Sequence, residues 1–217
     1  MDVAAGLARV RERIAKTCAR AGRDPASVRL IAVSKTKPLE LIREAAAAGQ
    51  TIFAENYAQE LRKKADALPA VEWHFVGAVQ TNKAKLVVGR AALIHTCDRL
   101  ALAQELSKRA KALGVTQRVL LEINVGREPQ KAGALPEDAS ALLEQVRALP
   151  ALSCEGLMCI PPAAGDPRPN FRSLRQLGQA LGLRELSMGM SADYESAIEE
   201  GATLVRVGTA IFGERAR

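Results

Sequence analysis

The chain has 217 residues, 48% of them hydrophobic and 25% charged, which is the composition of a soluble globular domain. No apolar run approaches the roughly 18 residues that a membrane helix needs, and the charged N-terminal segment has no signal-peptide core, so we expect one domain over residues 1–217, in the cytoplasm and without a membrane partner. The net charge of +7 does not indicate nucleic-acid binding, because basic residues are spread along the chain and aromatic residues make up only 3%. A solvated basic surface is the simpler interpretation, and it favours anionic small molecules.

The N-terminal segment predicts an amphipathic helix, because apolar residues recur at helical spacing from Val3 to Cys18 with charged residues between them. Eight short apolar runs follow, separated by longer helix-like stretches. The first four begin at residues 30, 51, 72 and 93, each 21 residues after the last, which indicates a repeated unit of strand, helix and two short loops. The predicted strands are residues 30–35, 51–56, 72–78, 93–98, 118–124, 152–160, 185–189 and 203–208.

This alternation predicts an α/β fold, namely a single (β/α)8 TIM barrel with an extra N-terminal helix. Strands that alternate with helices are parallel, and the chain length lies near the lower end of the range for such barrels. A doubly wound open sheet is the alternative, but it usually shows a glycine-rich phosphate turn after the first strand. Here that turn reads SKTKP, residues 34–38.

Lys35 ends the first predicted strand, in the stretch LIAVSKTKP (30–38). Reactive groups of a barrel lie at the C-terminal ends of its strands. Partial burial beside Ile31 and Val33 would lower the pKa of this amine, and a neutral lysine amine attacks aldehydes to form a Schiff base. The alternative is a structural lysine that pairs with Glu55, at the end of the second strand.

The last two predicted strands are followed by small and hydroxylated residues. Gly189 and Ser191 open a predicted helix after the seventh strand, and Gly208 and Thr209 do so after the eighth. Barrels most often hold a phosphate at these two loops, although the same residues could serve only as a tight turn and a helix cap. An amine across the barrel mouth from a phosphate site indicates a phosphorylated aldehyde, of which pyridoxal 5'-phosphate (PLP) is the common cofactor.

Arg206 lies two residues before Gly208, so strand alternation places both on the same face. An arginine that faces the pyridine nitrogen of PLP cannot accept its proton, which would leave the ring neutral and a weaker electron sink. A structural ion pair is the alternative explanation for an arginine within a strand.

Several stretches together resemble the pyridoxal phosphate homeostasis protein family, the single-domain relatives of the alanine racemase barrel. They are AVSKTKP (32–38), FAENYAQE (53–60), EWHFVGAVQTNKAK (72–85), GLMCIPP (156–162) and LSMGMSADYESAIEEGATLVRVGTAIFG (186–213). The resemblance extends from about residue 5 to residue 213 in the order of the family, and the combination of motifs is specific.

The resemblance implies that Lys35 forms the internal aldimine with PLP, that Asn56 lies near the cofactor and that Arg206 faces the pyridine nitrogen. The residues that it places around the phosphate are Ser191, Gly208 and Thr209, with Met188 and Met190 lining the same end. Members of the family carry PLP or regulate vitamin B6 and amino-acid balance without an established catalytic turnover. We therefore expect a PLP carrier or buffer in vitamin B6 homeostasis, with PLP-dependent apoenzymes as candidate recipients.

The chain departs from the family pattern at two places. Relatives usually read FGENY where this chain has Ala54, which adds a methyl group to the second strand. The loop after the fifth strand reads NVGREPQKAG (124–133), where relatives often have serines. Lys131 of this loop is a second amine, which we interpret as a solvated side chain.

An amino-acid racemase or decarboxylase of the same barrel type is the main alternative. Racemisation needs bases on both faces of the reacting carbon, and a lysine supplies only one. In the racemases that this barrel resembles, the opposing tyrosine comes from an added C-terminal domain, which also forms the dimer. The two tyrosines here, Tyr57 and Tyr194, each open a predicted helix, so we expect a monomer that binds the cofactor rather than an enzyme.

Two further alternatives remain open. Lys35 could be the Schiff-base lysine of an aldolase that acts directly on a sugar phosphate, with Lys37 or Glu55 as the proton shuttle. A pure interaction protein is the other, but it leaves both the lysine and the phosphate site without a role.

The histidines and cysteines do not have the pattern of a metal site. His74 and His95 lie on the third and fourth predicted strands without an acidic partner at ligand spacing, so we interpret them as core or mouth residues. Cys154 and Cys159 are five positions apart on one strand and should face opposite sides. All four cysteines are expected to be reduced thiols of the core.

Overall fold

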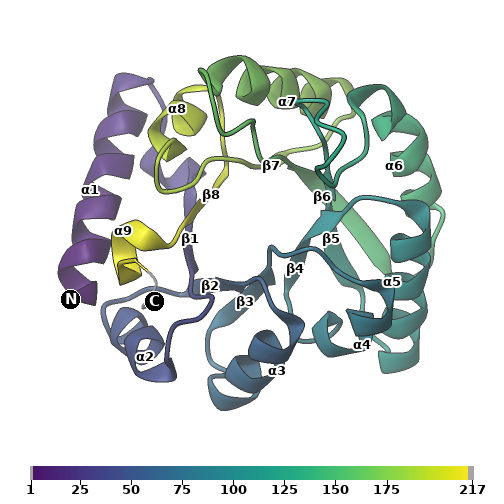
Figure 1. The fold of residues 1–217 in the computed structure, drawn as a ribbon, viewed down its shortest axis with the longest axis horizontal. Helices are drawn as coiled ribbons and strands as arrows, with labels where there is room; N and C mark the ends of the chain where they lie inside the picture. The colour runs from purple at the N-terminus through teal and green to yellow at the C-terminus, as the bar shows by residue number, and fades with distance from the viewer. Residues whose placement is uncertain (1, 215–217) are drawn as a thin grey trace.

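Eight parallel strands close into a barrel in chain order, with β1 hydrogen-bonded to both β2 and β8 (Figure 1). The computed structural model describes residues 2–214. The strands are β1 (Arg29–Val33), β2 (Ile52–Glu55), β3 (Glu72–Phe75), β4 (Leu93–Cys97), β5 (Gln117–Glu122), β6 (Leu152–Met158), β7 (Glu185–Ser187) and β8 (Leu204–Val207). Each overlaps its predicted range, so the predicted (β/α)8 barrel is confirmed.

Helices surround the barrel on its outer side (Figure 1). They are α1 (Val3–Arg20), α2 (Leu39–Ala47), α3 (Ala58–Ala67), α4 (Ala84–Val87), α5 (Leu100–Leu113), α6 (Ala139–Arg147), α7 (Arg168–Ala180), α8 (Tyr194–Glu199) and α9 (Thr209–Phe212). Short 3-10 turns cover residues Pro25–Ser27, Thr81–Lys83 and Pro136–Asp138. Within residues 2–214, no helix is both long enough and apolar enough to cross a membrane.

Helix α1 is the extra N-terminal helix that the apolar spacing predicts. The side chain of Asp2 caps its first turn by accepting a hydrogen bond from the backbone N–H of Ala5, at 2.9 Å. Its apolar face from Val3 to Cys18 is buried, and Gly6 lies against the last helix, α9. A Cβ at this glycine would lie 2.9 Å from the backbone oxygen of Ile211, so only glycine allows the first and last helices to pack this closely.

The core has two layers, because side chains alternate between the two faces of each strand. The outer layer lies between the strands and the helices and includes Phe53, Phe75 and Val205. The inner layer fills the barrel and consists of Ile31, Ile52, Ala54, Leu93, Leu120, Met158 and Leu204, with Val33 and Val76 packed against them. Residues two or four positions beyond an inner-layer residue therefore face the C-terminal mouth of the barrel.

Candidate functional site

A cavity of about 390 Å³ lies at the C-terminal mouth of the barrel. This volume is within the ordinary range for sites that bind small molecules. The residues that line it are Val33, Lys35, Lys37, Asn56, Val76, Ile160, Met190, Ser191, Ala192, Arg206, Gly208, Thr209 and Gly213. The structure therefore brings together seven of the eight predicted site residues, namely Lys35, Asn56, Met190, Ser191, Arg206, Gly208 and Thr209.

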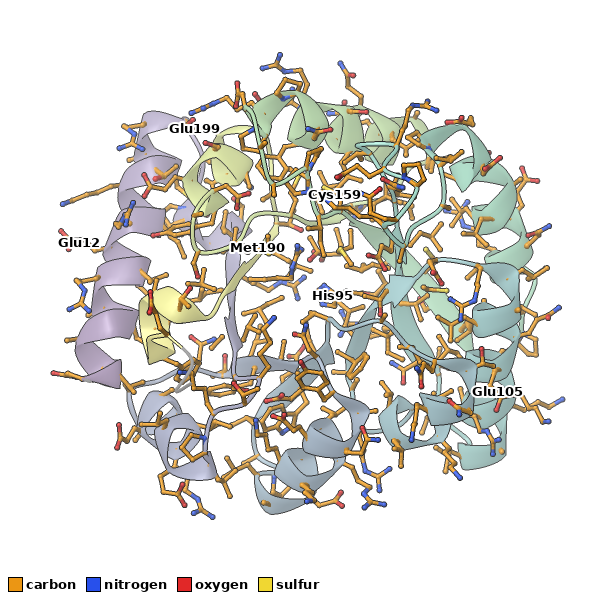
Figure 2. The ribbon with its side chains drawn as sticks, viewed as in Figure 1. Glu12, His95, Glu105, Cys159, Met190 and Glu199 are labelled. Carbon is orange, nitrogen blue, oxygen red and sulfur yellow. The ribbon has the colours of Figure 1, made fainter. Side chains whose placement is uncertain are left out.

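Met188 is the exception and corrects the predicted lining. Its side chain is fully buried in the outer core layer, because Ser187 faces the barrel interior and its neighbour along the strand must then face outward. Gly189 follows with a positive φ of 89°, which breaks the alternation and turns the chain towards the mouth. Met190 then lines the cavity and is 38% exposed (Figure 2).

Lys35 lies in the tight turn that follows β1 and is half-buried. The backbone N–H of Lys37 donates to the oxygen of Ser34 across this turn, at 3.0 Å. Thr36 adopts a positive φ of 62°, a conformation that is uncommon for a residue other than glycine. The turn therefore depends on contacts from outside itself to keep its shape.

Helix α3 supplies those contacts through a buried ionic network. Lys64 Nζ donates to Glu55 Oε1 at 2.7 Å, to Glu60 Oε2 at 2.8 Å and to the backbone oxygen of Ser34 at 2.9 Å. Glu60 Oε2 also accepts from the backbone N–H of Thr36 at 2.9 Å, and Glu55 Oε1 accepts from Ser34 Oγ at 2.6 Å. The residues on both sides of Lys35 are thus bound to α3, and the carboxylate of Glu55 is occupied by Lys64 and Ser34.

Burial raises the pKa of Glu55 to about 7, although Lys64 and Ser34 act in the opposite direction. Its second oxygen, Oε2, is buried and has no hydrogen-bond partner among the described residues. Desolvation without a partner for that oxygen favours the protonated form. The sequence did not reveal this network, because α3 and the β1 turn meet only through the fold.

Arg206 lies at the inner face of β8, where its residue is only 4% exposed. One guanidinium nitrogen donates to Ser187 Oγ at 2.7 Å, and another donates to the backbone oxygen of Cys159 at 3.0 Å. Burial lowers the pKa of this guanidinium, but an arginine keeps its charge in proteins. Within residues 2–214 no carboxylate lies at ion-pair distance from Arg206. The alternative interpretation of Arg206 as part of a structural ion pair is therefore wrong.

Ser191, Gly208 and Thr209 lie together at one end of the cavity. The backbone N–H of Gly208 donates to Ser191 Oγ at 3.2 Å, which joins the loops that follow β7 and β8. A Cβ at Gly208 would lie 3.1 Å from the backbone oxygen of Val33, so glycine lets the β8 loop approach β1 closely. The expected grouping of these three residues is present, with glycine and hydroxyl groups around a small space.

Asn56 directly follows the last residue of β2 and lines the cavity. Its side-chain oxygen, Oδ1, is buried and has no hydrogen-bond partner among the described residues. Buried polar atoms nearly always have a partner, so this oxygen is suited to a donor supplied by a bound molecule. Ala54, the departure from the family pattern, is buried in the inner core layer and does not line the cavity.

Glu122 is a buried carboxylate that the sequence did not single out. It ends β5 two residues after Leu120 of the inner layer, so it faces the barrel interior. Burial and the charge of Asp98 raise its pKa to about 7, and Arg206 acts in the opposite direction. An alternation count on the predicted fifth strand could have placed this carboxyl group inside the barrel.

The other candidate residues lie outside the cavity. Tyr194 is buried in the outer core layer with the guanidinium of Arg13 over its ring, and Tyr57 is 47% exposed, so neither tyrosine lines the cavity. Lys131 is half-buried rather than solvated, since it pairs with Glu128 and donates to the backbone oxygen of Pro161 at 2.9 Å.

His74 and His95 are core residues inside the barrel and lie 2.9 Å apart, from Nδ1 of His74 to Nε2 of His95. The expectation that they lack an acidic partner is wrong for His74, since its Nε2 lies 2.7 Å from Glu72 Oε1. In the part of the chain that the structure describes, no group of three or more His, Cys, Asp or Glu residues could hold a metal ion. All four cysteines are free thiols, three of them buried and Cys154 half-buried.

Comparison with known proteins shows the family of this chain. The family model described as "Alanine racemase, N-terminal domain" matches residues 6–216. A pyridoxal phosphate homeostasis protein of Aquifex aeolicus is 48% identical over 226 residues, which cover 99% of each chain. The chain belongs to the pyridoxal phosphate homeostasis protein family.

Solved structures place this family member among related barrels. PipY of Synechococcus elongatus PCC7942, solved with PLP bound, is 39% identical and superposes with a TM-score of 0.84 over 97% of this chain and 100% of its own. An alanine racemase of Clostridium difficile 630 has the same fold, with a TM-score of 0.78 at 14% identity. This chain covers only 57% of that racemase chain.

Proposed function

We propose that the protein binds PLP as a Schiff base on Lys35 and carries or buffers the cofactor for vitamin B6 and amino-acid homeostasis. The observation that carries this proposal is the placement of Lys35 and the buried cation Arg206 in one cavity, with the hydroxyl and glycine group at its end. The relatives named for pyridoxal phosphate homeostasis and the PLP-bound PipY structure support it.

The residues present fit PLP in three respects. Arg206 is a buried cation that lacks a carboxylate partner within residues 2–214, so it could donate to an acceptor atom of a ligand without the loss of an ion pair. Asn56 Oδ1 is a buried acceptor without a described partner, which suits the donor group of a ligand. Ser191 and Gly208 offer a hydroxyl and a close backbone approach, as a phosphate contact requires.

Each of these residues would have a defined role. The aldehyde of PLP is an electrophile that a lysine amine can bind reversibly. Lys35 would provide that amine, held in place by the contacts of α3 on either side of it. Ser191, Gly208 and Thr209 would hold the phosphate, Asn56 would bind a polar substituent, and Arg206 would keep the ring nitrogen unprotonated by offering only N–H donors.

The racemase alternative has less support. Neither Tyr57 nor Tyr194 lines the cavity, so no tyrosine within residues 2–214 is placed to act as a second base. The aldolase alternative needs a proton shuttle, but Glu55 is engaged by Lys64 and Ser34, and Lys37 Nζ donates to the backbone oxygen of Glu214 at 2.7 Å. A monomer, a cytoplasmic location and PLP-dependent apoenzymes as recipients are part of the same proposal.

The test is a visible absorption spectrum of the purified protein with added PLP, followed by borohydride reduction and peptide mapping. Lys37 lines the same cavity and provides a matched control, so Lys35→Ala and Lys37→Ala are measured beside the parent. We expect a Schiff-base band in the parent and in Lys37→Ala, its loss in Lys35→Ala, and the reduced adduct on Lys35. A band that survives Lys35→Ala, or an adduct on another lysine, would refute the proposed attachment.

Turnover is tested separately. The PLP-loaded protein is incubated with L-alanine, and the enantiomers and amine products are then separated by chiral chromatography. A carrier leaves L-alanine unchanged over the period in which the bound cofactor remains on the protein. Formation of D-alanine or ethylamine above the level of free PLP would instead favour an enzyme.

A further inference from the structure

A continuous line of hydrogen bonds crosses the barrel interior from Glu72, at the N-terminal end of β3, to Arg206 at the cavity. Figure 2 shows His95, a central member of this line, near the middle of the barrel. The four links are Glu72 Oε1 to His74 Nε2 at 2.7 Å, His74 Nδ1 to His95 Nε2 at 2.9 Å, His95 Nδ1 to Ser187 Oγ at 2.8 Å, and Ser187 Oγ to Arg206 at 2.7 Å. We call these five residues the barrel chain.

The two ends of the barrel chain fix the direction of every bond in it. Arg206 can only donate, whereas an ionised Glu72 can only accept. Because Glu72 accepts, His74 carries its proton on Nε2, and its Nδ1 accepts from the Nε2–H of His95. His95 Nδ1 then accepts from the hydroxyl of Ser187, whose oxygen accepts from Arg206. Four hydrogens serve four links, and this is the one arrangement that satisfies all of them with both rings neutral.

The surroundings favour neutral rings. Both histidines are fully buried, and burial lowers the pKa of each. The charges of Arg29 and Arg118 act in the same direction on His74, while Glu72 opposes them. Arg206 and Arg29 act in the same direction on His95. A second proton on His74 would point its Nδ1–H at the Nε2–H of His95, and a second proton on His95 would take the place of the Ser187 hydrogen, which would then have no acceptor in the barrel chain.

We infer that the barrel chain is a positioning device that fixes the guanidinium of Arg206 in the cavity from the opposite end of the barrel. Its three middle members are neutral groups, so they orient Arg206 without cancelling its charge. Glu72 acts through the two histidines, since its side chain is 37% exposed at the end remote from the cavity. The inference deepens the proposed function, because it assigns a support to the residue that would face the ring of PLP.

The tautomers of the histidines provide a direct test, because the chain contains only two histidines. Protein labelled with ¹⁵N-histidine, without added PLP, gives four ring-nitrogen signals in a two-bond ¹H–¹⁵N spectrum, assigned with a His74→Gln variant. We expect both rings to be neutral and protonated on Nε2 at neutral pH. An Nδ1–H tautomer or a doubly protonated ring at either position would overturn the inference. The tautomers are measured on the parent protein, so the result does not depend on whether a variant folds.

A second test separates positioning from a merely structural role. Glu72→Met removes the terminal acceptor, and Glu155→Met is the matched control, because Glu155 pairs with Arg118 beside Glu72 but lies outside the barrel chain. We expect Glu72→Met to give mixed tautomers and to weaken PLP binding on the order of threefold to tenfold, the loss of about one hydrogen bond. Glu72→Gln retains an acceptor, so it should keep the histidine tautomers and the PLP affinity of the parent. Glu155→Met should change neither the tautomers nor the affinity.

The outcomes distinguish this inference from the proposed function. Unchanged tautomers and unchanged PLP affinity in Glu72→Met would overturn the positioning role even if the parent binds PLP. If the parent does not bind PLP at all, the proposed function fails, and the tautomers of the parent and of Glu72→Met decide the inference alone.

Discussion

The ammonium of Lys64 lies 2.7 Å from Glu55 Oε1, in a pair whose side chains are 10% and 0% exposed. Neither residue lines the cavity, yet the pair holds Ser34 and, through Glu60, Thr36, which flank Lys35. Contacts from α3 and β2 thus hold the backbone on both sides of Lys35, which carries the candidate Schiff-base amine.

Removing the charge of Lys64 should therefore lower the stability of the fold. Breaking a buried ion pair leaves its partner uncompensated, and we expect Lys64→Met to lower the free energy of unfolding by about 3–5 kcal/mol above neutral pH. Below the pKa of Glu55, about 7, the loss should be smaller, because the carboxyl group is then protonated and needs no cation. Urea unfolding at acidic and alkaline pH measures this, with the exposed neighbour Lys63→Met as control. An equal loss of unfolding free energy in both variants would contradict the role given to Lys64 in the buried ionic network.

The buried carboxyl group of Glu122 should make stability depend on pH. Its pKa is about 7 in the folded protein and 4.5 in the reference state, so the folded protein binds the proton more tightly. Stability from this group is present below pH 4.5 and is lost as pH rises through 7, by on the order of 3 kcal/mol. Glu122→Gln should remove this part of the pH dependence, whereas the exposed Glu44→Gln should leave it intact. Identical unfolding curves for the parent and Glu122→Gln across that range would refute the assignment.

Ser191 should contribute to binding of the phosphate group of PLP. PLP carries a phosphate and pyridoxal does not, so Ser191→Ala should weaken PLP binding by about tenfold while the affinity for pyridoxal stays the same. Ser196→Ala, in α8 and outside the cavity, serves as the control. Equal loss for both ligands would indicate that Ser191 acts on the cavity as a whole.

The two methionines near the mouth should separate stability from binding. Met188 is buried in the outer core layer, so Met188→Ala should lower the free energy of unfolding by about 2–5 kcal/mol and leave PLP affinity unchanged. Met190 is 38% exposed and lines the cavity, so Met190→Ala should change PLP affinity with little effect on stability. Calorimetry and spectroscopic titration of both variants measure the two quantities, and the reverse pattern would contradict the assignment of the faces.

Much of the fold and part of the site follow from strand periodicity alone. The interval of 21 residues predicts the first four strand-helix units, and the alternation of Ile31, Val33 and Lys35 predicts the side from which Lys35 reaches the mouth. The same rule should have excluded Met188, since it follows Ser187 directly. It should also have paired Glu72 with His74, two residues apart on β3.

The remaining parts of the site depend on contacts that the order of residues does not reveal. Lys64 meets Ser34 across 30 positions, and His95 meets Ser187 across 92. Such pairs form only when the barrel closes in its particular register. The left-handed conformation of Thr36 is equally hidden, because threonine has no preference for it and the surroundings impose it.

The pairing of β1 with β8 has a consequence for synthesis on the ribosome. Ile31 and Arg206 lie opposite each other in neighbouring strands, although 175 positions separate them in the chain. A nascent chain that has not yet released β8 has an open edge on β1 and another on β7, and it lacks Arg206, Gly208 and Thr209 on one side of the cavity. The complete cavity is therefore formed only after β8 has joined the sheet and the first strand has received its second neighbour.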